Sequence, residues 1–165
     1  MRPFEHPPVR TVFGHPAHFL AFGFGSGLSP VAPGTAGTLV AIPLYLLLAP
    51  LPLYAYVLIT LLAMVAGFWI CGRSSAMLGV HDHRGIVWDE IVGYFITMAA
   101  APRGWIWVTA GFVLFRIFDV LKPWPANWAD RQLHGGVGIV MDDVFAGLYA
   151  LIVMQLVVHA GWLPV

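Results

Sequence analysis

The sequence predicts an all-α protein, a compact helical bundle of about five apolar helices embedded in a membrane. Hydrophobic residues make up 59% of its 165 residues and charged residues only 10%, against about 25% charged in ordinary soluble domains. The mean hydropathy is +0.82. A soluble monomer of this size would need more polar surface than eight basic and eight acidic residues supply.

The elements follow from the order of apolar runs and breakers. Residues 1–20, rich in Pro and His, predict a flexible N-terminal arm with a short helix near residues 16–22, and residues 21–165 predict a single helical domain. Five apolar runs predict helices at 38–49, 53–72, 91–101, 105–118 and 138–162. At about 1.5 Å per residue the shorter runs fall short of a hydrocarbon core of about 30 Å. We nevertheless expect all five helices to span the membrane fully or nearly so.

Five alternating helices place most charges at one end of the bundle. All Lys and Arg residues except Arg103 fall on the side from which the first helix starts. The positive-inside rule makes that side cytoplasmic. Because the net charge is zero, no basic field favours nucleic acid as a partner. The oligomeric state stays open.

The same alternation gathers acidic residues at that end. They are Asp89, Glu90, Asp119, Asp142 and Asp143. Gly93 follows Asp89 by four positions, and Gly147 follows Asp143 by four, so each glycine shares a helix face with its aspartate. Small residues allow close helix approach in membranes. We therefore expect the two acidic pairs to meet.

Such a cluster favours a metal site. Ionised groups beside apolar helices are costly and usually functional, and crowded carboxylates raise their own pKa values unless a cation intervenes. Oxygen-only ligands suit Mg²⁺. We expect Asp89, Glu90, Asp142 and Asp143 to bind Mg²⁺. Simple complementation of helix dipoles is the alternative.

Two further patterns suit phosphate. Arg116, Asp119 and Lys122 recur every three residues, which fits phosphate capture or a plain ion pair at a helix end. The Gly-rich segment 23–38 lacks a Walker A lysine but has glycines and hydroxyls suited to phosphate at a helix N-terminus, or to a tight turn. Its phosphate-binding candidates are Ser26, Ser29, Gly34, Thr35 and Thr38. The segment 81–83, His-Asp-His, is more typical of a polar loop than of a zinc site.

Taken together, these motifs resemble the phosphatidylglycerophosphatase A family over roughly residues 20–150. The segments that carry the resemblance are 25–30, 33–35, 82–83, 86–90 with Gly93, 115–119, 122–125, 135–139, 142–143 and 146–147. The resemblance implies a Mg²⁺-dependent lipid phosphatase of the bacterial inner membrane. It would convert phosphatidylglycerophosphate to phosphatidylglycerol. It also implies a central helix ringed by others.

The expected mechanism places a multi-pass protein's active site on the cytoplasmic face, with one or two Mg²⁺ ions and a phospholipid substrate. Asp119 completes the carboxylate cage or orients water, and Arg116 and Lys122 bind phosphate oxygens. Attack by water and an aspartyl-phosphate both remain open. The rivals are a phosphatase for another membrane phosphomonoester and a small ion or metal transporter. A transporter would need polar groups through the depth of the membrane.

Overall fold

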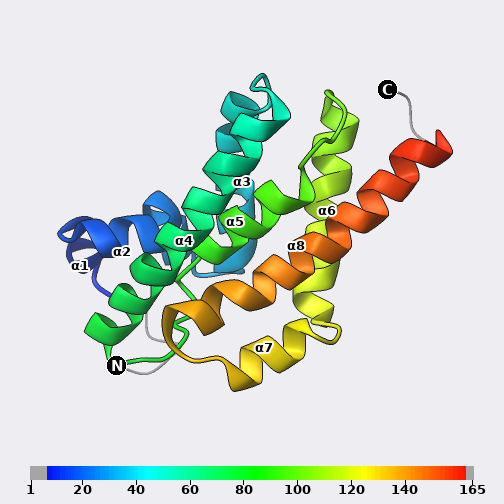
Figure 1. Ribbon diagram of the computed structural model, residues 1–165. Helices are drawn as coiled ribbons and strands as arrows, with labels where there is room; N and C mark the ends of the chain where they lie inside the picture. Colours follow the sequence, from blue (N-terminus) through cyan, green and yellow to red (C-terminus); the bar gives the residue numbers. More distant parts are fainter. Residues whose placement is uncertain (1–6, 163–165) are drawn as a thin grey trace.

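The computed structural model describes residues 7–162, and these residues form helices without any strand (Figure 1). In chain order the elements are α1 (Val9–Phe13), α2 (Pro16–Ala21), the 3-10 helix η1 (Gly23–Leu28), α3 (Pro33–Leu48), α4 (Leu53–Leu78), α5 (Trp88–Thr97), α6 (Trp105–Leu121), α7 (Ala126–Gln132) and α8 (Gly135–Ala160). The five expected apolar helices correspond to α3, α4, α5, α6 and α8. The all-α prediction is confirmed.

The N-terminal segment is partly helical. Residues 1–6 of the expected arm lie outside the described residues, whereas residues 7–20 include α1 and most of α2. The His15 Nδ1 atom accepts a hydrogen bond from the Ala17 amide at 3.1 Å and caps α2. The buried His18 ring lies 2.8 Å from the Ser74 hydroxyl of α4. This contact ties α2, the short helix expected near residues 16–22, to the bundle.

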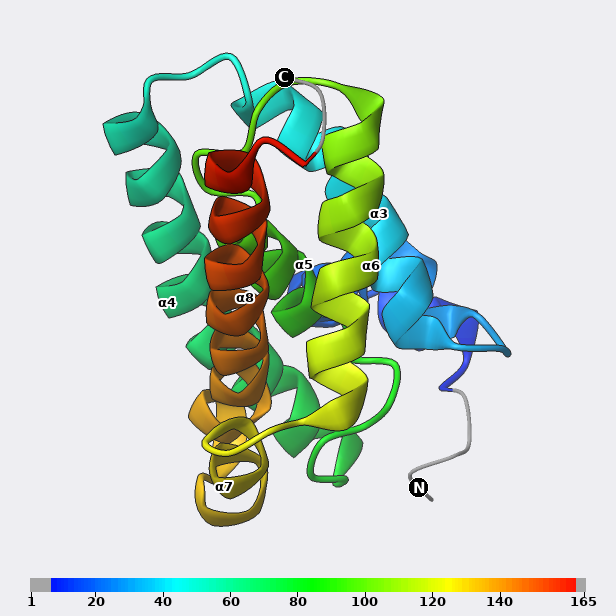
Figure 2. The same cartoon turned by 90° about the vertical axis from the view of Figure 1, so that its right-hand side faces the viewer.

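Helix α5 lies inside the bundle. It packs against α3, α4, α6 and α8, which surround it (Figure 2). Its residues 91–95 are buried, and two tyrosines bind backbone oxygens around it: Tyr94 donates to the Val108 carbonyl and Tyr56 donates to the Phe95 carbonyl. A short helix is therefore held from four sides, which fixes the direction of its first turn.

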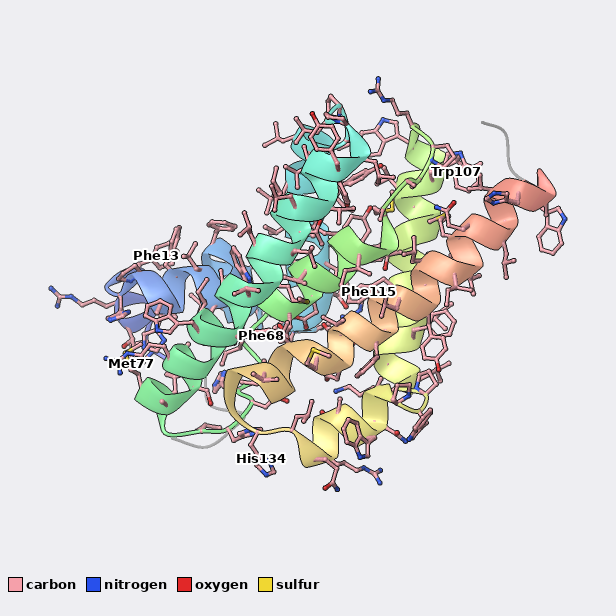
Figure 3. The ribbon with its side chains drawn as sticks, in the orientation of Figure 1. Phe13, Phe68, Met77, Trp107, Phe115 and His134 are labelled. Atoms are coloured by element: carbon pink, nitrogen blue, oxygen red, sulfur yellow. The ribbon has the colours of Figure 1, made fainter. Side chains whose placement is uncertain are left out.

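Helices α5 and α8 touch at glycines. A Cβ atom on Gly147 would lie 2.6 Å from the Gly93 carbonyl oxygen. A Cβ atom on Gly93 would lie 2.9 Å from the Asp143 carbonyl oxygen and would overlap the ring of Phe115, which lies within the bundle (Figure 3). Only glycine permits this approach. The close approach expected from the repeated spacing is confirmed, and it brings the acidic first turn of α5 against α8.

The expectation of about five membrane spans is wrong for the described residues. Only α4 and α8 are long and apolar enough to cross a membrane. The ten residues of α5 extend about 15 Å, half of a hydrocarbon core. Only 22% of the apolar stretch of α4 is buried, which is typical of a lipid-facing helix, whereas α8 is 56% buried. The two helices indicate association with a membrane.

Candidate active site

A cavity of about 280 Å³ opens at one end of the bundle. Helices α3, α5 and α8 begin at this end, and α6 ends there (Figure 1). The cavity is lined by every acid and cation that the sequence predicted for the site: Asp89, Glu90, Arg116, Asp119, Lys122, Asp142 and Asp143. The helix alternation thus places these residues at one level, as expected.

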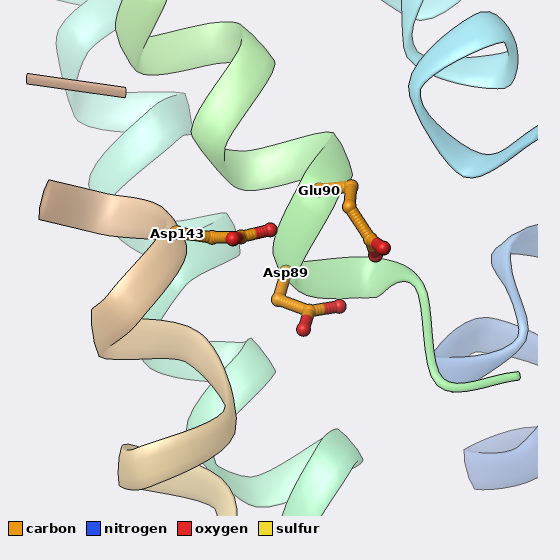
Figure 4. Close-up of side chains that lie close together, drawn as sticks. All are labelled: Asp89, Glu90 and Asp143. Atoms are coloured by element: carbon orange, nitrogen blue, oxygen red, sulfur yellow. The ribbon is translucent and has the colours of Figure 1, made fainter. Parts of the chain in front are cut away.

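Three carboxylates approach one another inside this cavity. Asp89, Glu90 and Asp143 each offer one oxygen, and these oxygens lie within 4.8 Å of one another. Figure 4 shows Asp143 on α8 facing the first turn of α5, which carries the other two. Asp89 Oδ1 and Glu90 Oε2 are buried without a hydrogen-bond partner. Buried acceptors left unpaired are costly, and a divalent cation would satisfy both. The donor set therefore fits Mg²⁺.

The electrostatics of the cluster agree with this fit. Burial and the neighbouring Asp119 raise the pKa of Glu90 to about 7. Burial and the charges of Glu90 and Asp143 raise the pKa of Asp89 well above its usual range. A bound cation would favour the ionised forms of both groups.

Asp142 has a different partner from the other three carboxylates. Its Oδ2 atom accepts a hydrogen bond from Lys122 Nζ at 2.6 Å, and Lys122 also donates to Asp130 Oδ1 at 2.9 Å. Burial lowers the pKa of Lys122, but Asp142 and Asp130 outweigh this effect and raise it above the ordinary value. Of the four carboxylates expected to meet, three form the cluster, and the fourth, Asp142, forms an ion pair with Lys122. The Asp142 Oδ1 atom is nevertheless buried without a hydrogen-bond partner.

Arg116 and Asp119 form an ion pair one turn apart on α6. This pairing confirms that the three-residue spacing puts them on one face. Gly34, the second residue of α3, lies close above them: a Cβ atom there would lie 3.1 Å from Arg116 Nη1 and would overlap the Glu90 carboxylate. Glycine at this position lets the N-terminus of α3 close over the site.

Three hydroxyls of the Gly-rich segment donate hydrogen bonds to its own backbone. Ser26 donates to the Gly23 carbonyl at 2.9 Å, Ser29 to the Val31 carbonyl at 2.8 Å, and Thr38 to the Gly34 carbonyl at 2.9 Å. Of the five residues predicted there to bind phosphate, only Gly34 lines the cavity. The others, Ser26, Ser29, Thr35 and Thr38, are not among its lining residues.

The loop before α5 contributes residues that sequence reasoning missed. Asp82 and Arg84 line the cavity, although the segment 81–83 was interpreted as a polar loop without a site role. The available signal was the family pattern, which includes Asp82. Asp130, the second partner of Lys122, stands in no motif, and spacing alone gave no reason to select it.

The family assignment follows from comparison with known proteins. The family model described as phosphatidylglycerophosphatase A matches residues 19–158. A phosphatidylglycerophosphatase A from Escherichia coli is 48% identical over 91% of this chain and 88% of its own length. One from Haemophilus influenzae is 48% identical over 91% of this chain and 94% of its own. A protein from Bacteroides thetaiotaomicron, provisionally named a phosphatidylinositol-3-phosphatase, is 42% identical over 85% of this chain and 90% of its own length.

No solved structure matches the chain significantly. The sequence matches extend over the carboxylate cluster, the Arg116–Asp119 pair and Lys122, so they include every charged residue of the cavity. The chain belongs to the phosphatidylglycerophosphatase A family.

Proposed function

We propose that the protein hydrolyses the terminal phosphomonoester of phosphatidylglycerophosphate, giving phosphatidylglycerol and phosphate, in a Mg²⁺-dependent reaction. The observation that carries this proposal is the cluster of Asp89, Glu90 and Asp143, of which the two aspartates are buried and Glu90 is half-buried, in the same cavity as Arg116 and Lys122. Cation ligands and phosphate ligands thus adjoin. Two relatives at 48% identity bear the name of this activity.

Asp89, Glu90 and Asp143 are the residues that would hold Mg²⁺. The unpartnered Asp142 Oδ1 makes Asp142 a fourth proposed ligand. When bound, the ion supplies Lewis-acid polarisation of a phosphoryl oxygen and neutralises charge in the transition state. The four carboxylates would hold it between α5 and α8, the two helices that meet at Gly93 and Gly147.

Arg116 and Lys122 bind the phosphate oxygens in this proposal. The planar guanidinium of Arg116, which pairs with Asp119, can donate two parallel hydrogen bonds to a phosphate. The ammonium group of Lys122, which pairs with Asp142 and Asp130, supplies a compact positive charge. Gly34 brings the first turn of α3 close enough for its backbone amides to face the same group. The hydroxyls of Ser26, Ser29 and Thr38 would first have to release their backbone acceptors.

Two routes of attack fit this cavity. In the first, water attacks phosphorus in line, and Asp119 orients it or keeps Arg116 in place. In the second, an aspartate carboxylate attacks phosphorus, the P–O bond to phosphatidylglycerol breaks and that alcohol leaves with a proton, and water then hydrolyses the aspartyl-phosphate to phosphate. Rapid quench of a single turnover distinguishes them, because phosphate trapped on the protein requires the second route.

We further propose a multi-pass protein of the bacterial inner membrane whose site faces the cytoplasm. Helices α4 and α8 are its candidate spans, and the basic residues of the site lie at the end that the positive-inside rule assigns to the cytoplasm. Ion transport is not favoured. The acids of the cavity lie at one end of the bundle, whereas a pathway requires polar groups at successive depths.

Phosphate release from phosphatidylglycerophosphate by purified protein in detergent tests the function. We expect release that requires Mg²⁺, stops with EDTA, and falls by about 100-fold or more in Asp143→Asn. Asp130→Asn, which changes a carboxylate outside the cluster that contacts Lys122, should lower activity far less than Asp143→Asn. Faster release from phosphatidic acid or phosphatidylinositol 3-phosphate would overturn the substrate assignment. Metal flux into sealed vesicles without phosphatase activity would favour transport.

A further inference from the structure

A second cavity lies beside the proposed active site, along the outer face of α6. Its volume is about 460 Å³, and it is lined by Phe112, Val113, Arg116, Ile117, Val120 and Leu121. Arg116 and Val120 also line the carboxylate cavity. The two cavities therefore adjoin, one charged and one apolar.

The α6 groove, defined by these six residues, is an unpartnered apolar surface. Val120 and Leu121 are each 71% exposed, and Val113 and Ile117 are also exposed. Phe115, on the same helix, is fully buried in the core between α6 and its neighbours. Helix α6, at the outside of the bundle in Figure 2, thus has one face packed and one face open.

The charge of the groove suits a phospholipid whose phosphate lies at Arg116 and whose acyl chain lies along the apolar residues next to it. Phe112 and Leu121 are nine residues apart on a helix, a distance of about 14 Å. Arg116 lies near the middle of this length, about 6 Å along the axis from Phe112, so an acyl chain that starts at Arg116 contacts Phe112 and Val113 before it leaves the groove. Arg116 is the only charged residue that lines the groove, and it lines the charged cavity too.

A comparable apolar cavity on α4 lacks this connection. It measures about 170 Å³ and is lined by Tyr56, Val57, Thr60, Leu61, Ile96, Ala99 and Leu151. None of these residues is charged, and none lines the carboxylate cavity. If both cavities were only parts of a general lipid-facing surface, substitutions in either one would have the same effect. The α4 cavity therefore provides a matched control.

We propose that the α6 groove binds an acyl chain of the phospholipid substrate, and that Arg116 guides the phosphomonoester of the same molecule into the carboxylate cavity. This inference rests on the proposed lipid phosphatase function and adds a specificity determinant to it. The face of α6 then recognises the acyl chain, while the cavity recognises phosphate.

Dependence on the presence of the acyl chain tests the groove. Val113→Trp fills the groove one helical turn from Arg116, where a bound acyl chain would lie and where a substrate without acyl chains has no atoms. We expect the ratio of kcat/KM for dipalmitoyl phosphatidylglycerophosphate in mixed micelles over its deacylated analogue, which keeps the phosphomonoester, to fall about tenfold, through KM. Leu61→Trp, in the α4 cavity, should leave the ratio at the wild-type value. An unchanged ratio in Val113→Trp, or an equal fall in Leu61→Trp, overturns the inference while the phosphatase function stands.

A binding readout keeps the inference testable without turnover. Cys71 is fully buried, so maleimide labelling reports on a thiol introduced by Ile117→Cys or, as control, Leu61→Cys. With Mg²⁺ present, a dipalmitoyl phosphonate analogue of the substrate should slow labelling of Ile117→Cys about tenfold at ten times its Kd. It should not slow labelling of Leu61→Cys. Equal protection by dipalmitoyl phosphatidylglycerol, which lacks the phosphomonoester, would show general lipid coverage and overturn the proposal. Lack of turnover with selective protection would instead reject the proposed reaction alone.

Discussion

Gly147 of α8 packs directly against Gly93 of α5, with room for no Cβ atom between them. Each glycine stands four residues after an aspartate. The contact therefore sets the separation of the Asp89 and Asp143 carboxylates, because each aspartate lies one helical turn from its glycine on the same helix face. Helix packing and the geometry of the proposed metal site are coupled at this point.

Gly147→Ala is expected to lower stability and weaken metal binding together. The added methyl group would press on the Gly93 carbonyl, and overpacking of this kind costs about 1–3 kcal/mol. Thermal unfolding and Mn²⁺ binding followed by electron paramagnetic resonance measure the two effects. Leu148→Ala, at a neighbouring exposed position, is the control. Weakened stability with unchanged Mn²⁺ affinity would separate packing from the site.

Mg²⁺ is expected to stabilise the protein more as pH rises through about 7. In the metal-free protein the raised pKa of Glu90, about 7, favours the protonated folded state, and this contribution is lost as pH rises. A cation requires the ionised form, so protons compete with it below that pH. Thermal shifts with Mg²⁺ at about pH 6 and about pH 8 check this. Asp89→Asn should remove most of the Mg²⁺-induced thermal shift at both pH values. An equal shift in the wild type at the two pH values would contradict competition between protons and Mg²⁺.

Lys122→Met is expected to destabilise the protein by about 1–3 kcal/mol, because it leaves the buried Asp142 carboxylate without its donor. The double variant Lys122→Met with Asp142→Asn should recover most of that loss, since the only carboxylate that then loses its partner is Asp130, which is exposed to solvent. Chemical unfolding of the wild type, both single variants and the double variant completes the cycle. Additive losses would show that the pair is not coupled. In activity assays Lys122→Met should raise KM for the lipid.

The buried His18 is expected to make stability fall at mildly acidic pH. Burial and the adjacent His15 lower the pKa of His18 in the folded state. The unfolded chain therefore binds a proton first, so stability is fully present above the unfolded pKa of about 6.5 and declines as pH falls below it. His18→Gln should reduce this decline, measured as unfolding midpoints across the range. Ser74→Ala, which removes the 2.8 Å partner of the ring, should keep it. An identical pH profile in His18→Gln would exclude this origin.

Regular features of the molecule were predictable from the sequence. Apolar runs and their Pro and Gly breakers predicted the five helices, and the alternation of those helices put Asp89, Glu90 and Asp143 in one cavity. Even the approach of α5 to α8 was predictable, because helical periodicity fixes which residue shares a face with each aspartate. These inferences needed only the direction of each helix and the spacing along it.

The tertiary structure decided which groups became partners. Spacing could not show that Lys122 bridges Asp142 and Asp130, that the hydroxyls of Ser26 and Ser29 bind their own loop, or that Arg116 lines two cavities at once. Nor could it limit the candidate spans to α4 and α8, since helix ends depend on tertiary contacts. A hydrogen bond or ion pair changes over tenths of an ångström, and such distances are set by how separate helices pack, not by local periodicity.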